Sequence, residues 1–196
     1  AAMQAASNYA WANRHMIGHW TREVWQQILG ADAPLNTMYD VSHNIGKVEK
    51  HRVNGSEKSL VMHRKGATRA FGPGSLETPL KYRSIGQPVL IPGTMGTASY
   101  VLAGTNDSMD VAFGSSCHGA GRKMSRAQAK QSVRGSVLRE QLQSQGIVVR
   151  SDSDPGLAEE APEAYKDVEQ VIDVVHGAGL ARKVARLKPL AVIKGG

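Results

Sequence analysis

Short apolar runs, each ended by glycine or proline, constrain this chain more than any other feature. "QPVLIPG" (87–93) and "TASYVLAG" (97–104) have the length and composition of buried strands. Asn54-Gly55 separates two partly alternating segments, which indicates a β-hairpin over residues 46–66 with a loop of two or more residues. Because helical patterns also occur, we expect an α+β fold with a mixed or antiparallel sheet and surface helices.

The rest of the chain alternates between helical patterns and short extended runs. Apolar residues at helical spacing predict a first helix that stops at Gly30 and a late helix that stops at Gly177. "GSSCHGAGR" (114–122) contains too many glycines to favour a helix or a strand. The other predictions are a strand and turn at 38–44, a helix at 125–145 with a break near Gly135, a strand at 147–150, a basic helix at 178–188 and a strand at 190–194.

The composition excludes several classes of protein. No run approaches the roughly 20 apolar residues of a membrane span, so we expect no membrane association. A single cysteine excludes an intramolecular disulfide framework and fits a reducing, cytoplasmic setting. The formal net charge of +7 favours a polyanionic partner such as a nucleic acid or a nucleotide. Aromatic residues are only 5% of the chain, which argues against a binder built on stacking platforms.

The first residues already lie inside a helical pattern. Helices normally begin after a Ser, Thr, Asp or Asn cap, and none precedes Ala1. The pattern therefore predicts a truncated chain or a processed piece of a longer one.

Three segments contain residues that suit ligand binding. In "YDVSHNIGK" (39–47), His43 could bind a metal such as manganese, although a polar turn is the simpler interpretation. "HRKGATRAFGPGS" (63–75) places Lys65 and Arg69 among glycines, which suits either a phosphate or a solvated basic loop. "LIPGTMGTAS" (90–99) is a strand followed by a hydroxyl-rich loop that matches no common phosphate fingerprint.

The segment 114–122 places the only cysteine beside a histidine. Adjacent side chains seldom converge on one metal ion, and a catalytic Cys–His pair normally comes from separate parts of a fold. Two interpretations of Cys117 and His118 remain open. His118 could attack phosphorus directly, with Arg122 nearby, or it could be a turn histidine beside a Cys117 that packs in the core.

Six segments in order closely resemble the C-terminal part of the RtcB family, which comprises GTP- and manganese-dependent RNA ligases. They are "YDVSHNIGKVE", "HRKGATRAF", "GQPVLIPGTMGTASYVLAG", "FGSSCHGAGRKMSR", "EEAPEAYKDVEQVI" and "VARLKPLAVIKG". The resemblance covers the chain from about Ala1 to its end. It implies that residues 1–196 are the C-terminal portion of a single catalytic domain.

The resemblance also implies roles for individual residues. His118 would be the nucleophile that becomes guanylylated, and His43 would be one manganese ligand. Lys65, Arg69 and Arg122 would contact the phosphates of RNA or nucleotide. Thr94 stands where relatives are expected to have serine, and it keeps the hydroxyl. The expected contacts of the guanylate are Thr94, Met95, Ser99, His118, Ala120, Gly121, Tyr165 and Lys194.

One departure from the family pattern is important. The family uses further metal ligands, an Asp, a Cys and two more His, that belong to an upstream half which this sequence lacks. Cys117 is not that metal-binding cysteine, so we expect it to be a buried small residue. The resemblance therefore predicts a ligase fragment that is inactive alone and needs the missing N-terminal half.

The expected reaction joins RNA ends that carry a 2′,3′-cyclic phosphate or 3′-phosphate to 5′-hydroxyl ends. The expected partners are GTP, Mn²⁺, RNA (tRNA halves or broken RNA ends) and, in some cases, an activating protein. An alternative is a non-catalytic RNA- or nucleotide-binding module that keeps the guanylate pocket. A basic α+β domain without any ligand is a third possibility.

Overall fold

The computed structural model describes residues 2–194, and the chain divides into two units, residues 1–65 and residues 66–196. Each unit has its own set of helices and strands. That residues 1–196 form part of a single catalytic domain stays a prediction.

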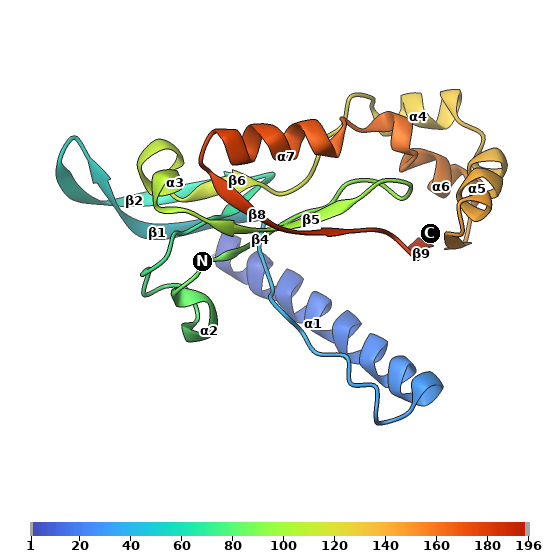
Figure 1. The fold of residues 1–196 in the computed structure, drawn as a ribbon, viewed down its shortest axis with the longest axis horizontal. Coiled ribbons are helices and arrows are strands. Elements are labelled where there is room, and N and C mark those ends of the chain that lie inside the picture. The colour runs from blue at the N-terminus through green and yellow to red at the C-terminus, as the bar shows by residue number, and fades with distance from the viewer. Residues whose placement is uncertain (1, 195–196) are drawn as a thin grey trace. The chain divides into compact units, whose positions relative to one another are not determined.

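The first unit begins with α1 (Ala2–Leu29), which is the predicted opening helix. No described residue of α1 is buried, and all three tryptophans of the chain lie on it. The following segment runs back along the helix, as Figure 1 shows in light blue. Trp25 Nε1 donates to the Ala33 carbonyl at 2.7 Å, and Trp11 Nε1 donates to Ser42 Oγ at 2.6 Å. The tryptophans therefore fasten this segment to α1.

The prediction of a strand at residues 38–44 is wrong. Residues 34–42 have no regular secondary structure, and the first strand begins at Asn44. The segment is held by helix side chains rather than by a neighbouring strand, because Arg14 donates to the Val41 carbonyl at 2.7 Å and pairs with Asp40 at 2.5 Å. An extended sequence pattern forms a strand only where a neighbouring strand is available for hydrogen bonding, and these residues have none in the described part of the chain.

The predicted hairpin is confirmed. β1 (Asn44–Val53) and β2 (Ser56–Lys65) pair antiparallel along their whole length, with Val53 opposite Ser56. The loop is only two residues long, and both have positive φ, 51° at Asn54 and 80° at Gly55. Asparagine tolerates this conformation and glycine has no β-carbon to oppose it, so the pair suits the tightest hairpin turn.

A buried polar cluster joins the two strands of the hairpin. Glu49, His51 and Arg64 are each at most 3% exposed. Arg64 donates to both oxygens of Glu49, at 2.8 and 2.9 Å, and His51 Nε2 lies 3.0 Å from Glu49 Oε2. Buried charges require such pairing, because each would otherwise lose its hydration without compensation.

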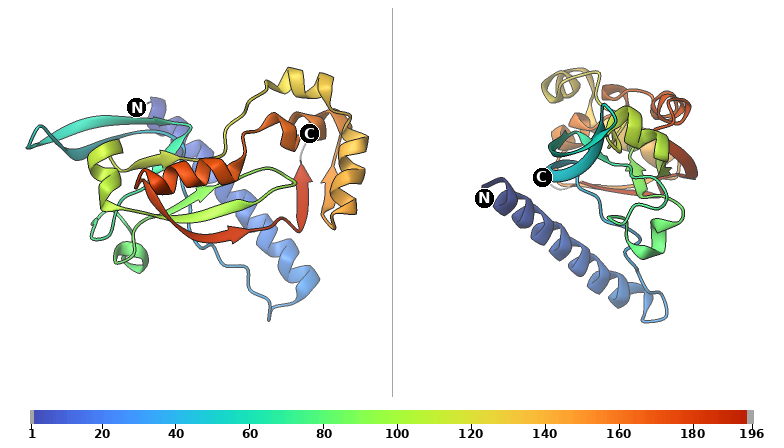
Figure 2. Two further views of the ribbon diagram at one scale, coloured as in Figure 1. Left: turned by 45° about the horizontal axis from the view of Figure 1, so that its top comes forward. Right: turned by 90° about the vertical axis from the view of Figure 1, so that its left-hand side faces the viewer.

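The centre of the second unit is a three-stranded antiparallel sheet covered by a helix. β5 (Ser99–Gly104) pairs with β4 (Pro88–Ile91) on one side and with β8 (Ala181–Leu187) on the other. α7 (Val168–Gly177) lies over the sheet in Figures 1 and 2. The buried side chains between them include Val89, Ile91, Leu102, Val168, Ile172 and Val175. Burial of each stabilises the fold by about 1.5–3 kcal/mol.

The prediction of a short basic helix over residues 178–188 is wrong, because most of this segment is β8. Its backbone completes the edge of the sheet, with Ala181 opposite Gly104. Two of its cations pair with α7: Lys183 with Asp173, and Arg186 with Glu169 at 2.9 Å. Tertiary pairing thus overrides the helix propensity of a segment rich in Ala, Arg and Lys.

A two-stranded pair orders the first part of the glycine-rich segment. β3 (Ala67–Arg69) pairs antiparallel with β6 (Ser115–Cys117), so that Ala67 lies opposite Cys117. The expectation that residues 114–122 contain no strand is therefore wrong for residues 115–117. Backbone hydrogen bonds with β3 stabilise a strand that its own composition does not favour.

A second hydrophobic cluster joins short helices and a parallel strand pair. β7 (Val148–Ser151) pairs with β9 (Ala191–Lys194), and α5 (Gly135–Ser144) and α6 (Asp154–Glu159) pack nearby. The predicted break near Gly135 is confirmed, since α4 (Arg126–Ser132) ends before α5 begins. The remaining short elements are α2 (Leu80–Arg83), α3 (Asn106–Ala112) and the 3₁₀ helix η1 (Pro162–Ala164).

Helices and small, mostly antiparallel sheets together confirm the α+β class. Among residues 2–194, no helix combines the length and the hydropathy that a membrane span requires.

Space for a side chain is absent at Gly104, at the end of β5. A β-carbon there would lie 2.4 Å from the Ala70 carbonyl oxygen. We predict that Gly104→Ala lowers the free energy of unfolding by about 1–3 kcal/mol, as overpacking does, measured by urea titration. Gly177→Ala is the control, because nothing lies within 4 Å of its β-carbon position. Equal stability of both variants would contradict this packing.

Candidate functional site

His118 directly follows β6, so the β3–β6 pair sets the position from which its imidazole extends. The side chain is half-buried. The backbone of Gly66 approaches it: a β-carbon there would lie 3.8 Å from His118 Cδ2 and 3.9 Å from Nε2. Gly66 also has a φ of 68°, a conformation that favours glycine. The turn before β3 therefore brings backbone against the imidazole without the bulk of a side chain.

The β4–β5 loop (residues 92–98) contacts the loop that follows His118 (residues 118–122). The amide of Ala120 donates to the Pro92 carbonyl at 3.1 Å, and Ala120 itself is buried. This amide is therefore used to hold the two loops together. The predicted guanylate contacts of the two segments lie side by side for this reason.

Hydroxyl groups shape the β4–β5 loop from within. The amide of Thr94 donates to Thr97 Oγ1 at 2.9 Å, and the two threonine hydroxyls are also 2.9 Å apart. The amide of Gly93 donates to Ser99 Oγ at 3.4 Å. Met95 packs against the second hydrophobic cluster. The loop is thus a closed turn, ordered by the hydroxyls of Thr94 and Ser99, which were predicted to contact a guanylate, and by that of Thr97, which was not.

Arg122 and Tyr165 form a half-buried polar network. The guanidinium of Arg122 lies 4.7 Å from the centroid of the Tyr165 ring, and its Nη1 donates to Tyr165 Oη at 2.9 Å. The same guanidinium pairs with Glu160 at 3.3 Å and donates to the Glu159 carbonyl at 2.6 Å. Tyr165 Oη in turn donates to Glu160. Arg122 therefore holds Tyr165 beside the 118–122 loop.

The network changes the pKa of the Tyr165 hydroxyl. Burial raises the pKa of the Tyr165 hydroxyl above its ordinary value, and the hydrogen bond to the Glu160 carboxylate raises it further. The phenol therefore stays protonated and keeps donating to Glu160 at neutral pH.

Cys117 points to the core side of the loop. It packs against the cluster between the sheet and α7, and burial raises the pKa of its thiol above the ordinary value. A protonated thiol is a poor nucleophile and a poor metal ligand. This environment agrees with the expectation that Cys117 is a packing residue, although the side chain is half-buried rather than fully buried.

His43 lies in the first unit, just before β1. It lines a small pocket of about 120 Å³ with Trp11, Arg14 and Asn44 among its neighbours. Within residues 2–194, no group of three or more His, Cys, Asp or Glu side chains is arranged to hold a metal ion. The described residues therefore offer one imidazole here rather than a complete manganese site.

The predicted phosphate contacts differ in what surrounds them. Arg69 pairs with Glu77 at 2.6 Å and lies over the Phe71 ring, which leaves its side chain 14% exposed. Lys65 is exposed at the end of β2. The side chain of Lys194 lies outside the described part of the chain. Arg69 and Arg122 are thus both engaged in protein contacts, whereas Lys65 is open to solvent.

The second unit brings three sequence-predicted segments together: the β4–β5 loop, the 118–122 loop and Tyr165. Sequence reasoning missed two residues. Glu160 positions Tyr165, and Gly66 lies against His118. Glu160 belongs to "EEAPEAY", so its spacing of five residues from Tyr165 was the one available signal. Gly66 gave no such signal, because its contact with His118 depends on the β3–β6 pairing.

Comparison with known proteins finds relatives that match along the whole chain. A family model described as tRNA-splicing ligase RtcB matches residues 1–195. The tRNA-splicing ligase RtcB of Archaeoglobus fulgidus is 56% identical over all of this chain, and that of Thermococcus kodakarensis is 55% identical over 99% of it. The relative from Pyrococcus furiosus is 55% identical over 99% of the chain.

The half-buried histidine and its glycine-rich loop thus occur in a chain whose relatives are ligases. The chain is a member of the RtcB family. It spans 41% of the length of the Archaeoglobus fulgidus and Thermococcus kodakarensis relatives and 20% of the Pyrococcus furiosus relative.

We predict that Arg122→Lys lowers the free energy of unfolding by about 1.5–3 kcal/mol, the usual range for hydrogen bonds to charged groups. Lysine cannot reproduce the guanidinium fork or its stacking on Tyr165. Urea unfolding measures the change, with Arg134→Lys, an exposed arginine at the start of α5, as the control. An Arg122→Lys protein as stable as the control would contradict the network.

A second prediction follows from the raised pKa of the Cys117 thiol. Only the thiolate reacts with iodoacetamide, so alkylation of the native chain should be slower than that of the urea-unfolded chain, with its rate midpoint at higher pH. The unfolded chain releases this proton first, so the free energy of unfolding should fall as the pH rises past the ordinary thiol pKa. Identical pH–rate profiles in both states would refute the shift.

Proposed function

We propose that this chain provides the guanylylation centre of a GTP- and Mn²⁺-dependent RNA ligase. The reaction joins a 2′,3′-cyclic phosphate or 3′-phosphate end of RNA to a 5′-hydroxyl end. The observation that carries the proposal is the arrangement around His118. The loop that follows it is hydrogen-bonded to the β4–β5 loop through Ala120 and Pro92, and is held beside Tyr165 through Arg122.

In the proposed first step, one imidazole nitrogen of His118 attacks the α-phosphorus of GTP. A P–N bond forms, the bond to the bridging oxygen of the β-phosphate breaks, and pyrophosphate leaves. The histidine must be neutral to attack. For a 2′,3′-cyclic phosphate end, water first breaks the bond from phosphorus to the 2′-oxygen and gives a 3′-phosphate and a 2′-hydroxyl. The GMP group then passes to the RNA 3′-phosphate, which frees the imidazole, and the 5′-hydroxyl displaces GMP from that activated end.

The described residues suit a guanylate in two respects. The approach of Gly66 keeps side-chain bulk away from one side of the imidazole. Hydrogen bonds with Arg122 and Glu160 fix Tyr165, so that its ring can serve as a rigid wall for the base. The amide of Ala120 is committed to Pro92, so its proposed role is to hold the loop.

Manganese binding is a separate proposal, because the described residues do not form a complete metal site. His43 would contribute one imidazole ligand. We propose that the other ligands come from the part of the relatives' length that this chain does not span. Bound manganese would neutralise the triphosphate and stabilise developing charge.

The test combines this chain with the complementary portion of the Archaeoglobus fulgidus relative, GTP and Mn²⁺. Peptide mass spectrometry should find covalent GMP on His118, and His118→Ala should abolish it. His176→Ala, an exposed histidine at the end of α7, is the matched control and should keep the adduct.

Two results would contradict the proposal. An adduct on another residue, or none, would remove His118 as the nucleophile. RNA binding by the wild type without any GMP transfer would favour a non-catalytic RNA-binding module instead.

A further inference from the structure

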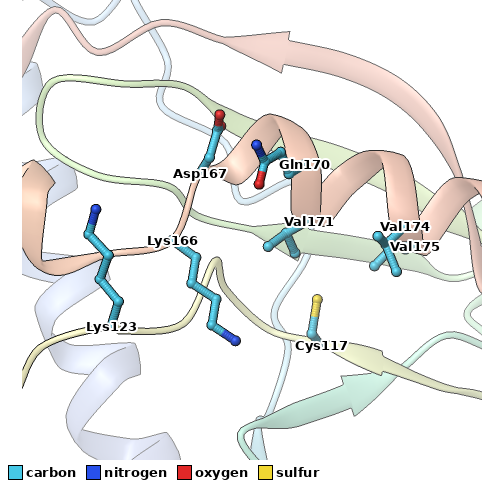
Figure 3. Close-up of a pocket in the computed structure, with 8 residues that line it drawn as sticks. All are labelled: Cys117, Lys123, Lys166, Asp167, Gln170, Val171, Val174 and Val175. Atoms are coloured by element: carbon cyan, nitrogen blue, oxygen red, sulfur yellow. The ribbon is translucent and has the colours of Figure 1, made fainter.

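A pocket of about 740 Å³ lies in the second unit between α7 and the segment that surrounds His118. Figure 3 shows its walls: lysines from two segments on one side, and valines of α7 facing the sulfur of Cys117 on the other. Its lining residues are Cys117, Lys123, Lys166, Asp167, Gln170, Val171, Val174 and Val175.

Two cations, Lys123 and Lys166, line the pocket. In the part of the chain that the structure describes, neither the Lys123 nor the Lys166 ammonium group forms a hydrogen bond or an ion pair. Their backbones are nevertheless fixed, because the Lys123 amide donates to the Ala164 carbonyl and the Lys166 amide to the Gly121 carbonyl, both at 2.9 Å. Two exposed ammonium groups on fixed backbones favour a phosphate ligand.

Asp167 is the one acidic residue among these lining residues, and it has a structural use. Its Oδ1 accepts from the Glu169 amide at 2.9 Å and caps α7. In Figure 3 its carboxylate points away from the side chain of Lys166. The charge of the pocket lining is therefore positive on balance.

The opposite wall is apolar. Val171, Val174 and Val175 present methyl groups, and Val174 is 69% exposed. An apolar wall beside paired cations suits a ligand that has both an apolar face and phosphates. A nucleotide unit of a single strand has this combination, since the base and sugar can lie on methyl groups while the flanking phosphates meet lysines.

The pocket adjoins the proposed nucleophile without overlapping its guanylate contacts. Cys117 immediately precedes His118 and Lys123 follows it by five residues, so both ends of the His118 loop border the pocket. Thr94, Ser99 and Tyr165 do not line it. A strand bound here would lie next to His118, whereas the base of a guanylate would contact other residues.

We propose that this pocket binds the RNA strand near the end to be joined, with backbone phosphates on Lys123 and Lys166 and a nucleoside against the α7 valines. This inference rests on the proposed function for its choice of RNA. Single-stranded RNA is the occupant, because its phosphates complement the two ammonium groups and its base and sugar suit the apolar wall.

The single cysteine of the chain allows a direct test, since it lines the pocket. The probe is a short single-stranded RNA with a 3′-phosphate, and the measurement is the alkylation rate of Cys117 in the native chain. With RNA at about ten times its Kd, the rate should fall about tenfold, in proportion to the fraction of empty pocket. An unchanged rate with RNA bound would overturn the proposal.

Inorganic phosphate and GTP provide the comparison arms. Neither should protect Cys117 at concentrations where the RNA does. Protection by GTP equal to that by RNA would assign the pocket to a free nucleotide and would overturn the choice of RNA.

A charge variant gives an independent readout. Removing both ammonium groups with Lys123→Ala and Lys166→Ala should reduce the slope of log Kd against log salt concentration by about 1.4, or 0.7 per phosphate contact. Lys58→Ala, an exposed lysine on β2, is the control and should leave the slope unchanged. Equal slopes in the double variant and the control would refute the lysine contacts.

Failure of this inference and failure of the proposed function are distinguishable. RNA binding and Cys117 protection are measured without GTP, whereas the guanylylation test at His118 requires no RNA. GMP transfer with an unprotected Cys117 would remove only the pocket assignment. Protection of Cys117 without GMP transfer would remove only the guanylylation proposal.

Discussion

The packing of α7 on the three-stranded sheet is the interaction on which the second unit depends. Ile172 is fully buried between Val89, Leu102 and their neighbours, and the same cluster includes Ala120 and partly buried Cys117. The residues on either side of His118 are therefore anchored in the main hydrophobic core. Because interiors are close-packed, this anchoring limits how far the loop can move. A glycine-rich segment acquires a defined position from its neighbours rather than from its own composition.

Polar contacts also help to hold the loop that contains His118. The hydrogen bond from Ala120 to Pro92 joins two loops, and Arg122 joins the second loop to Tyr165 and Glu160. These groups are half-buried, where a hydrogen-bonded arrangement is favoured and an unpaired charge is penalised. Arg122 was predicted to contact phosphate, but in the structure it binds other protein groups. Its guanidinium contacts a tyrosine, a carboxylate and backbone oxygens, whereas the ammonium groups of Lys123 and Lys166 form no ion pair with any residue that the structure describes.

Local signals in the sequence predicted those elements that depend on near neighbours. Asn54-Gly55 predicted the hairpin, and the structure shows a two-residue turn whose positive φ angles suit these residue types. The stop at Gly30 and the break near Gly135 were also predicted. The wrong predictions concern segments whose secondary structure depends on a partner distant in the sequence. Residues 181–187 form a strand because β5 offers an edge. Residues 38–42 have no strand partner in the part of the chain that the structure describes, and Arg14 of α1 donates to the Val41 carbonyl instead.

The sequence by itself determined the family, the α+β class, the hairpin and the residue types available for chemistry, since these depend on composition and on local spacing. Only the tertiary structure decided which of those residues meet. It placed Gly66 against His118, directed Arg122 to Tyr165 and opened a cationic pocket beside Cys117. The physical reason is that each contact joins segments distant in the chain, so it exists only after strand pairing and core burial have brought their backbones together.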